Sequence, residues 1–166
     1  MNDGKIDDHQ QIPLEKNMSP HFGLMDETGM SREEALLMRA KLHWRAGVRR
    51  MRVKKIPAGL TTLYDALLSA MRWYILLNRR DDLGDDAGEQ LENERYVFSL
   101  LRKAGVLDGS IDIHGIEVIV DRALMGDEVD REDQEKVLAQ FGEILTRIGI
   151  LPFDQLELPP EDPSTF

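Results

Sequence analysis

Residues 59–80 read GLTTLYDALLSAMRWYILLNRR, and apolar side chains occupy most positions from Leu60 to Leu77. They point in nearly every direction around a helix of 3.6 residues per turn, so this helix must be packed on several sides. Asp65 and Arg72 interrupt the stretch, which leaves fewer than about 18 uninterrupted apolar residues and argues against a membrane span. The stretch therefore predicts the central helix of a bundle, with no membrane partner.

A first helix is predicted before this central one. It begins at Ser31, where the hydroxyl and the carboxylate of Glu34 can form a capping box. Pro57 ends it near residue 54, because proline disfavours helical geometry in the residue before it. The central helix is then expected to start after Gly59, with one of the next two threonines as its cap.

Three helices are predicted after the central one, the first of them over 89–104. Residues 112–125 fit a strand or a helix, and the Asp112 cap, the length of the segment and the following Gly126 favour the helix. The last helix starts at the Asp130 cap and carries apolar residues at helical spacing. The chain is therefore predicted to be all-α, a single-domain bundle of about five helices.

The bundle is expected to occupy residues 30–150, between two less regular ends. Residues 1–29 show no sustained apolar period and are interpreted as an irregular N-terminal arm. Residues 151–166 form an acidic, proline-rich C-terminal tail, and the part from Pro159 onward is expected to be disordered. Four apolar residues are expected to hold the first half of this tail on the bundle: Leu151, Phe153, Leu156 and Leu158.

The composition of the 166 residues excludes several kinds of site. The chain contains no cysteine, which rules out disulfides, thiol nucleophiles and cysteine-containing zinc sites. Its first residues form neither a basic start nor an apolar run, so no secretory signal is predicted. We therefore expect a cytoplasmic protein.

The net charge of −10 conceals a strong asymmetry along the chain. Residues 31–80 carry twelve Lys or Arg and three Asp or Glu, whereas residues 81–166 carry seven and twenty-two. Such unlike-charged regions can lie against one another within a monomer, between two copies, or against a partner.

The basic run from 39 to 55 is the strongest signal outside the predicted core. Like charges three and four residues apart destabilise a helix, so these cations are expected to be neutralised by something. The candidates are nucleic acid, an acidic partner, or the acidic half of this chain, and the net negative charge favours the last of these over nucleic acid. The run contains no acid and has eight basic residues: Arg39, Lys41, Arg45, Arg49, Arg50, Arg52, Lys54 and Lys55.

Asp65, Ser69 and Arg72 share one stripe of the central helix, because they are four and three residues apart. They could form a hydrogen-bonded set that lines an active-site cleft, since an ionised group in apolar surroundings needs a partner. The stripe could instead be the edge of the helix that faces solvent, and this interpretation is favoured because surface helices usually keep such an edge.

His114, Glu117 and Asp121 would share one helix face, a spacing that metal sites in helical bundles use. Such sites need matching ligands on a facing helix, and the chain offers no second Glu-x-x-His pair. We therefore interpret the three residues as a polar outer face and expect neither a metal nor another cofactor. The sequence also lacks the common nucleophile and phosphate-binding motifs.

Residues 59–72, GLTTLYDALLSAMR, resemble the core helix of the HEPN superfamily. The resemblance implies a compact helical bundle, frequently dimeric, of a kind that includes RNases and partners of nucleotidyltransferases in toxin–antitoxin systems. Catalytic members carry an arginine followed after four to six residues by a histidine on a late helix. Here no such arginine precedes His114, and Arg39 and His43 are separated by only three residues. The resemblance therefore implies a non-catalytic member, a binding or assembly module without catalytic residues.

The leading hypothesis is a non-catalytic interaction protein that assembles, as a homodimer or with an acidic protein partner, through its basic first helix. The first alternative is RNA binding or processing through the same helix. The second is an enzyme or small-molecule-binding protein that uses Asp65 and Arg72. The candidate interface residues of the leading hypothesis are Arg45, Arg49, Arg50 and Arg52.

Overall fold

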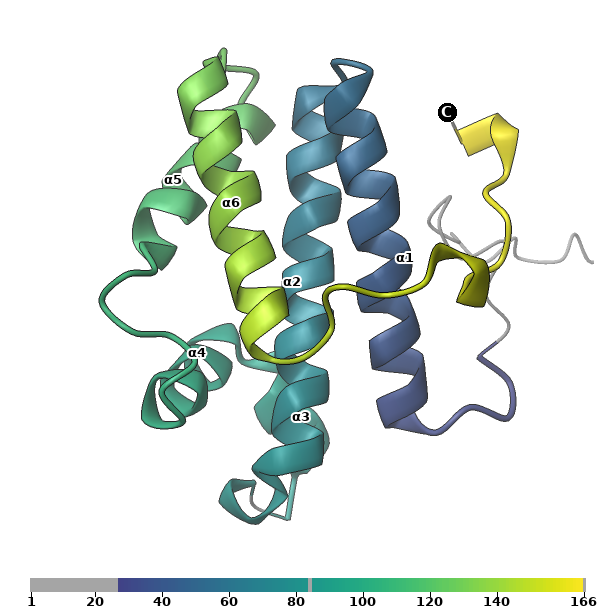
Figure 1. The fold of residues 1–166 in the computed structure, drawn as a ribbon. Coiled ribbons are helices and arrows are strands. Elements are labelled where there is room, and N and C mark those ends of the chain that lie inside the picture. Colours follow the sequence, from purple (N-terminus) through teal and green to yellow (C-terminus); the bar gives the residue numbers. More distant parts are fainter. Residues whose placement is uncertain (1–26, 84, 166) are drawn as a thin grey trace, which may run out of the picture.

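The computed structural model describes residues 27–83 and 85–165, which contain six α-helices and no β-strand. Figure 1 shows α1 and α2 side by side, with α4 and α5 on the side of α2 away from α1. The all-α prediction is confirmed, with one helix more than expected. The elements are α1 Arg32–Arg52, α2 Ile56–Asn78, α3 Ala87–Glu92, α4 Glu94–Lys103, α5 Ile113–Leu124 and α6 Arg131–Arg147, with short 3₁₀ turns η2 Arg80–Asp82, η3 Gln155–Glu157 and η4 Pro163–Thr165.

The capping box before α1 is confirmed. The Ser31 hydroxyl accepts from the Glu34 amide at 3.1 Å, and the Glu34 carboxylate accepts from the Ser31 amide at 2.8 Å. The start predicted for the central helix is wrong, because α2 already begins at Ile56. A proline is tolerated in a first helical turn, where its missing N–H would have no partner within the helix. Thr61 and Thr62 donate to carbonyls inside α2 and do not cap it.

α2 is the centre of the bundle, as predicted. It packs against α1, α4, α5 and α6. Burying one large apolar side chain stabilises a fold by about 1.5–3 kcal/mol, so the buried side chains of α2 contribute strongly to the stability of the bundle. Five large side chains of α2 have no exposed surface: Leu60, Leu63, Leu67, Met71 and Ile75.

The predicted helix over 89–104 is wrong, because the chain forms two helices there. Asn93 separates α3 from α4 with an extended backbone, φ −82° and ψ 102°, and its side chain accepts from the Tyr96 amide at 3.1 Å. Asparagine is among the best N-cap residues, so this bond favours a new helix start. The break gives α4 its own direction and brings its first residue, Glu94, to Tyr64 of α2.

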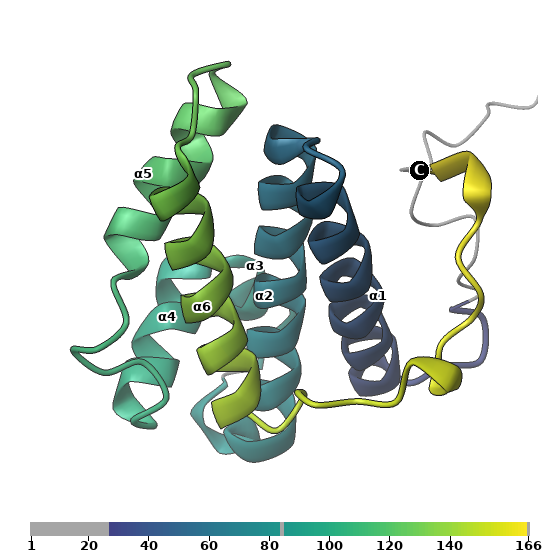
Figure 2. The ribbon, with the colours of Figure 1, turned by 45° about the horizontal axis from the view of Figure 1, so that its top comes forward.

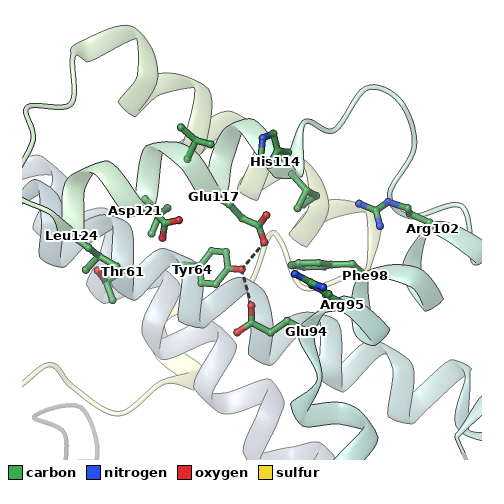
Figure 3. Close-up of a pocket in the computed structure, with 13 residues that line it drawn as sticks. Thr61, Tyr64, Glu94, Arg95, Phe98, Arg102, His114, Glu117, Asp121 and Leu124 are labelled. Carbon is green, nitrogen blue, oxygen red and sulfur yellow. Dashed lines mark hydrogen bonds between the residues drawn. The ribbon is translucent and has the colours of Figure 1, made fainter.

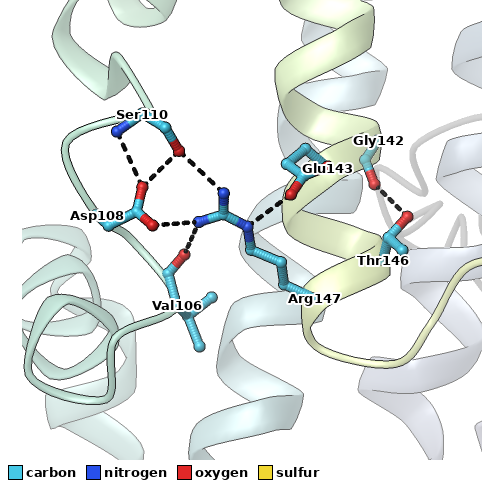
Figure 4. Close-up of polar contacts among 7 residues, drawn as sticks. All are labelled: Val106, Asp108, Ser110, Gly142, Glu143, Thr146 and Arg147. Carbon is cyan, nitrogen blue, oxygen red and sulfur yellow. Dashed lines mark hydrogen bonds and ion pairs between the residues drawn. The ribbon is translucent and has the colours of Figure 1, made fainter.

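Residues 112–125 form the predicted helix, α5, which is capped by Asp112. Arg147 near the end of α6 fixes the loop that leads into this helix (Figure 4). Its guanidinium donates to the Val106 carbonyl at 3.0 Å and to the Ser110 hydroxyl at 2.9 Å, and it pairs with Asp108 at 3.1 Å. These contacts hold the start of α5 against α6 and so fix the position of α5.

The Asp108 carboxylate makes this anchor sensitive to acid. Hydrogen bonds from Ser110 and then from Arg147 lower the pKa of Asp108 to about 2. A carboxylate with a lowered pKa in the folded state stabilises the fold above its unfolded pKa of about 3.9 and loses this effect as the pH falls toward 2. Asp108→Asn should therefore lower the melting temperature at neutral pH and have little effect near pH 2. Thermal melts followed by circular dichroism between those two pH values would measure this.

The control for this prediction is Asp127→Asn, because the Asp127 carboxylate is exposed and makes no hydrogen bond or ion pair with the described residues. It removes the same charge without touching the anchor. An equal loss of melting temperature in both variants would contradict the role given to Asp108.

The C-terminal tail lies along α1, on the side away from α4 and α5, in both views of the molecule (Figures 1 and 2). Leu158 is buried, with 7% of its surface exposed, and Leu151 and Phe153 pack partly against the core. These three were predicted to hold the tail. Leu156 was also predicted to do so, which is wrong because it is 90% exposed.

Only residues 27–29 of the predicted arm 1–29 are described, and they form a turn before α1. The rest of the arm lies outside the described residues. Among the helices of the described part, none combines the length and the apolar composition that crossing a membrane requires.

Candidate functional site

Three basic residues of α1 form ion pairs with the acidic tail of the same chain. We call Lys41, Arg45 and Arg49 the basic face. They are four residues apart and therefore lie on one side of the helix. Glu157 pairs with Lys41 at 3.3 Å, and Glu161 pairs with Arg49 at 2.6 Å and with Arg45 at 3.4 Å.

The tail also contacts the basic face through its backbone and its apolar side chains. The Arg45 guanidinium donates to the Pro159 carbonyl at 2.7 Å, so the prediction of disorder from Pro159 onward is wrong. The Lys41 ammonium lies 5.6 Å from the centre of the Phe153 ring, a distance that allows a cation–π contact. Leu158 lines a small hollow of about 310 Å³ together with Leu37 and other residues of α1. The tail is thus held by charge and by apolar contact.

The four candidate interface arginines do not lie on one surface. Arg45 and Arg49 contact the tail, whereas Arg50 donates to the Thr62 hydroxyl of α2. Arg52 is exposed at the end of α1. Burial lowers the pKa of Arg45, with Glu161 opposing this shift, and burial together with Arg49 lowers the pKa of Arg50. Arginine nevertheless stays protonated in proteins, so the basic face remains positive at neutral pH.

Asp65, Ser69 and Arg72 of the predicted stripe have different surroundings in the structure. Arg72 donates to the Leu91 carbonyl at 2.8 Å and so ties α3 to α2. Ser69 is buried, and Asp65 is exposed. Desolvation by the surrounding protein raises the pKa of Asp65, and the charge of Arg72 opposes this shift. Neither Asp65 nor Arg72 lines the pocket of about 800 Å³ that lies between α2, α4 and α5.

A pocket of about 800 Å³ lies between α2, α4 and α5, and we call it the Tyr64 pocket (Figure 3). The Tyr64 phenol lies 3.0 Å from a carboxylate oxygen of Glu94 on α4 and 3.3 Å from one of Glu117 on α5. Burial, and then the two carboxylates, raise the pKa of Tyr64, so the phenol stays protonated and acts as a donor. Phe98 of α4 forms an apolar part of the wall.

Three residues that the sequence analysis placed on one helix face form one wall of this pocket. His114, Glu117 and Asp121 do share the face of α5 that lines it, as their spacing predicted. Within the described residues, no group of three or more His, Cys, Asp or Glu side chains could hold a metal ion. Glu94 was missed because residues 89–104 were predicted as one helix. Asn93 followed by Glu94 could have indicated a new helix start, because asparagine is a favoured N-cap residue.

Two features of the described residues thus offer a site: the basic face, which is covered by the tail, and the Tyr64 pocket between α2, α4 and α5. Figures 1 and 2 show α4 and α5 on the side of α2 away from α1. Neither presents an arrangement of nucleophile and base that would define a reaction. In comparisons with protein-family models, with curated proteins and with solved structures, none matches the chain.

Proposed function

We propose that this protein is a non-catalytic interaction protein whose basic face binds an acidic segment of a partner. One observation carries the proposal: the chain's own acidic tail lies on that face and pairs two glutamates with three of its cations. The tail acts as a built-in ligand, and its chemistry indicates the chemistry of the partner. That partner would present acids spaced like Glu157 and Glu161, with an apolar side chain between them.

The strength of these contacts supports a tail that can be displaced. The cations are largely covered, with 15–18% of their side-chain surface exposed, but the two glutamates are 25% and 62% exposed. Ion pairs that water reaches are worth about 0–1 kcal/mol each. A tethered segment also competes at an effective concentration of roughly millimolar. A partner with more contacts than the tail can therefore replace it.

A second copy of the chain would supply such a segment by exchanging its tail, which is how the homodimer hypothesis fits this proposal. The RNA-binding alternative would use the same cations against phosphate. It would also require the acidic tail to leave first, and no contact of the described residues favours RNA over an acidic peptide.

The test is a titration with a fluorescently labelled peptide of residues 152–163, PFDQLELPPEDP. The double variant Glu157→Gln and Glu161→Gln weakens the internal tail, so it should bind the peptide about tenfold more tightly than the wild type at low salt. This corresponds to the loss of about 1.4 kcal/mol from the competing contacts. Salt should weaken the binding, because the contacts are ionic.

Two controls define the outcome. Arg45→Glu with Arg49→Glu should abolish binding, whereas Arg131→Glu, a charge reversal at an exposed residue of α6, should leave it unchanged. Equal affinity in all of these proteins would refute the proposal. Light scattering on the same unlabelled samples at low and high salt would show whether copies of the chain exchange tails.

A further inference from the structure

We infer that the Tyr64 pocket is a second binding site, and that its ligand is a small organic zwitterion whose ammonium group lies beside Tyr64 and whose carboxylate lies at the arginines of α4. The pocket has a volume of about 800 Å³, within the range of about 300–1,000 Å³ that is usual for small-molecule sites. It lies between α2, α4 and α5 and shares no lining residue with the basic face, so this inference does not depend on the proposed function.

The phenol of Tyr64, at the centre of the pocket, lies between two carboxylates and leaves room for a further donor. Tyr64 has two carboxylate neighbours, Glu94 at 3.0 Å and Glu117 at 3.3 Å. A phenol has one proton and can donate to only one carboxylate at a time. An ammonium group has three donors and a positive charge, so beside the phenol it would bond to the second carboxylate and offset the repulsion between the two.

Several charged side chains that line the pocket have no ion-pair partner among the described residues. Within the described residues, neither Glu117 and Asp121 of α5 nor Arg95 and Arg102 of α4 take part in an ion pair. Arg122, the charged residue of α5 that lies outside the pocket, does have a partner, Asp133 at 3.2 Å. The pocket thus holds charges of both signs that the fold leaves available to a ligand.

The acidic and the basic side chains lie at different ends of the pocket. Figure 3 shows the carboxylates of Glu94 and Glu117 around Tyr64, and the arginines on the side of the Phe98 ring. Glu94 and Arg102 are eight residues apart on α4, which is about 12 Å along a helix. The buried ring of Phe98 lies halfway between them. A short alkyl chain with a charge of opposite sign at each end matches this order.

The experiment is isothermal titration calorimetry with a series of ω-amino acids: γ-aminobutyrate, ε-aminocaproate and ω-aminocaprylate. We expect the two longer compounds to bind at least about tenfold more tightly than the shortest, because only they reach from Tyr64 toward Arg102. Hexylamine and hexanoate each lack one charged end. Each should bind about tenfold more weakly than ε-aminocaproate.

Three variants assign the two ends of the ligand. Glu117→Gln should weaken the binding of both ε-aminocaproate and hexylamine. Arg102→Gln should weaken ε-aminocaproate and leave hexylamine unchanged, a split that general misfolding could not produce. Glu128→Gln removes an exposed carboxylate outside the pocket and should change neither.

Two results would overturn the inference. One is the absence of heat from ε-aminocaproate and ω-aminocaprylate at about 10 mM, well above the range of specific weak ligands. The other is binding that Glu117→Gln and Arg102→Gln leave unchanged. Because the peptide titration of the basic face uses none of these residues, failure here would leave the proposed function untouched.

Discussion

Gly47→Leu should lower the free energy of unfolding by about 3 kcal/mol, because α1 and α2 touch at this glycine. A Cβ atom at position 47 would lie 2.6 Å from Cγ of Leu63 and 3.1 Å from its backbone nitrogen. Leu63 is fully buried and cannot move aside without disturbing the core. A leucine would gain about 1 kcal/mol from its better helix propensity, which is too little to offset the clash.

Gly142→Ala is the control for adding a Cβ atom to a glycine inside a helix. A Cβ there would meet only the Trp44 ring, at 3.5 Å, which is an ordinary contact. This variant should gain up to about 1 kcal/mol through helix propensity alone. Urea unfolding followed by circular dichroism would compare the two. If Gly47→Leu proved as stable as the wild type, the close approach of α1 and α2 described above would be wrong.

Several features of the fold could be predicted because they depend on residues close together in sequence. The Ser31 capping box and the Asp112 and Asp130 caps each need a side chain and an amide three residues away. The central position of α2 follows from its apolar residues, which point in nearly every direction around the helix. These caps and this apolar pattern each depend on residues that are close together in the sequence, so the sequence alone could reveal them.

The errors have a common physical cause, which is contact between distant parts of the chain. Tyr64 meets Glu94 and Glu117, which are 30 and 53 residues further along, so no local pattern shows the pocket. The end of the tail was expected to be disordered from its proline and acid content. Composition does not reveal that Glu161 lies beside Arg45 and Arg49 on a helix more than a hundred residues earlier.

The four candidate arginines have different contacts in the structure. The sequence treated Arg45, Arg49, Arg50 and Arg52 as one interface, but the first two contact the tail, the third contacts α2 and the last is exposed. Helical spacing already separates Arg50 from the row of residues four apart that forms the basic face. Asp65 and Arg72 were likewise grouped by spacing, and Arg72 is instead used to bind the Leu91 carbonyl.

Two leucines of the tail provide the sharpest test of how it is held. Leu158→Ala should release the tail, because Leu158 is 7% exposed and lies against α1, where it lines the hollow together with Leu37. Truncating a buried leucine to alanine costs about 2 kcal/mol at the low end of the observed range, which suits a site at the surface. Leu156→Ala, two residues earlier, removes the same atoms from a side chain that is 90% exposed and should change little.

Hydrogen exchange of the Glu157 and Leu158 amides would measure the difference. Both donate to carbonyls within the tail, at 3.2 Å, and should exchange when the tail leaves α1. A loss of about 2 kcal/mol corresponds to roughly thirtyfold faster exchange in Leu158→Ala, with the amides of α2 unaffected because detachment of the tail is a local opening. The same variant should also bind the 152–163 peptide more tightly than the wild type. If both leucine variants behaved alike, charge alone would hold the tail, and the apolar residue proposed for the partner segment would be unnecessary.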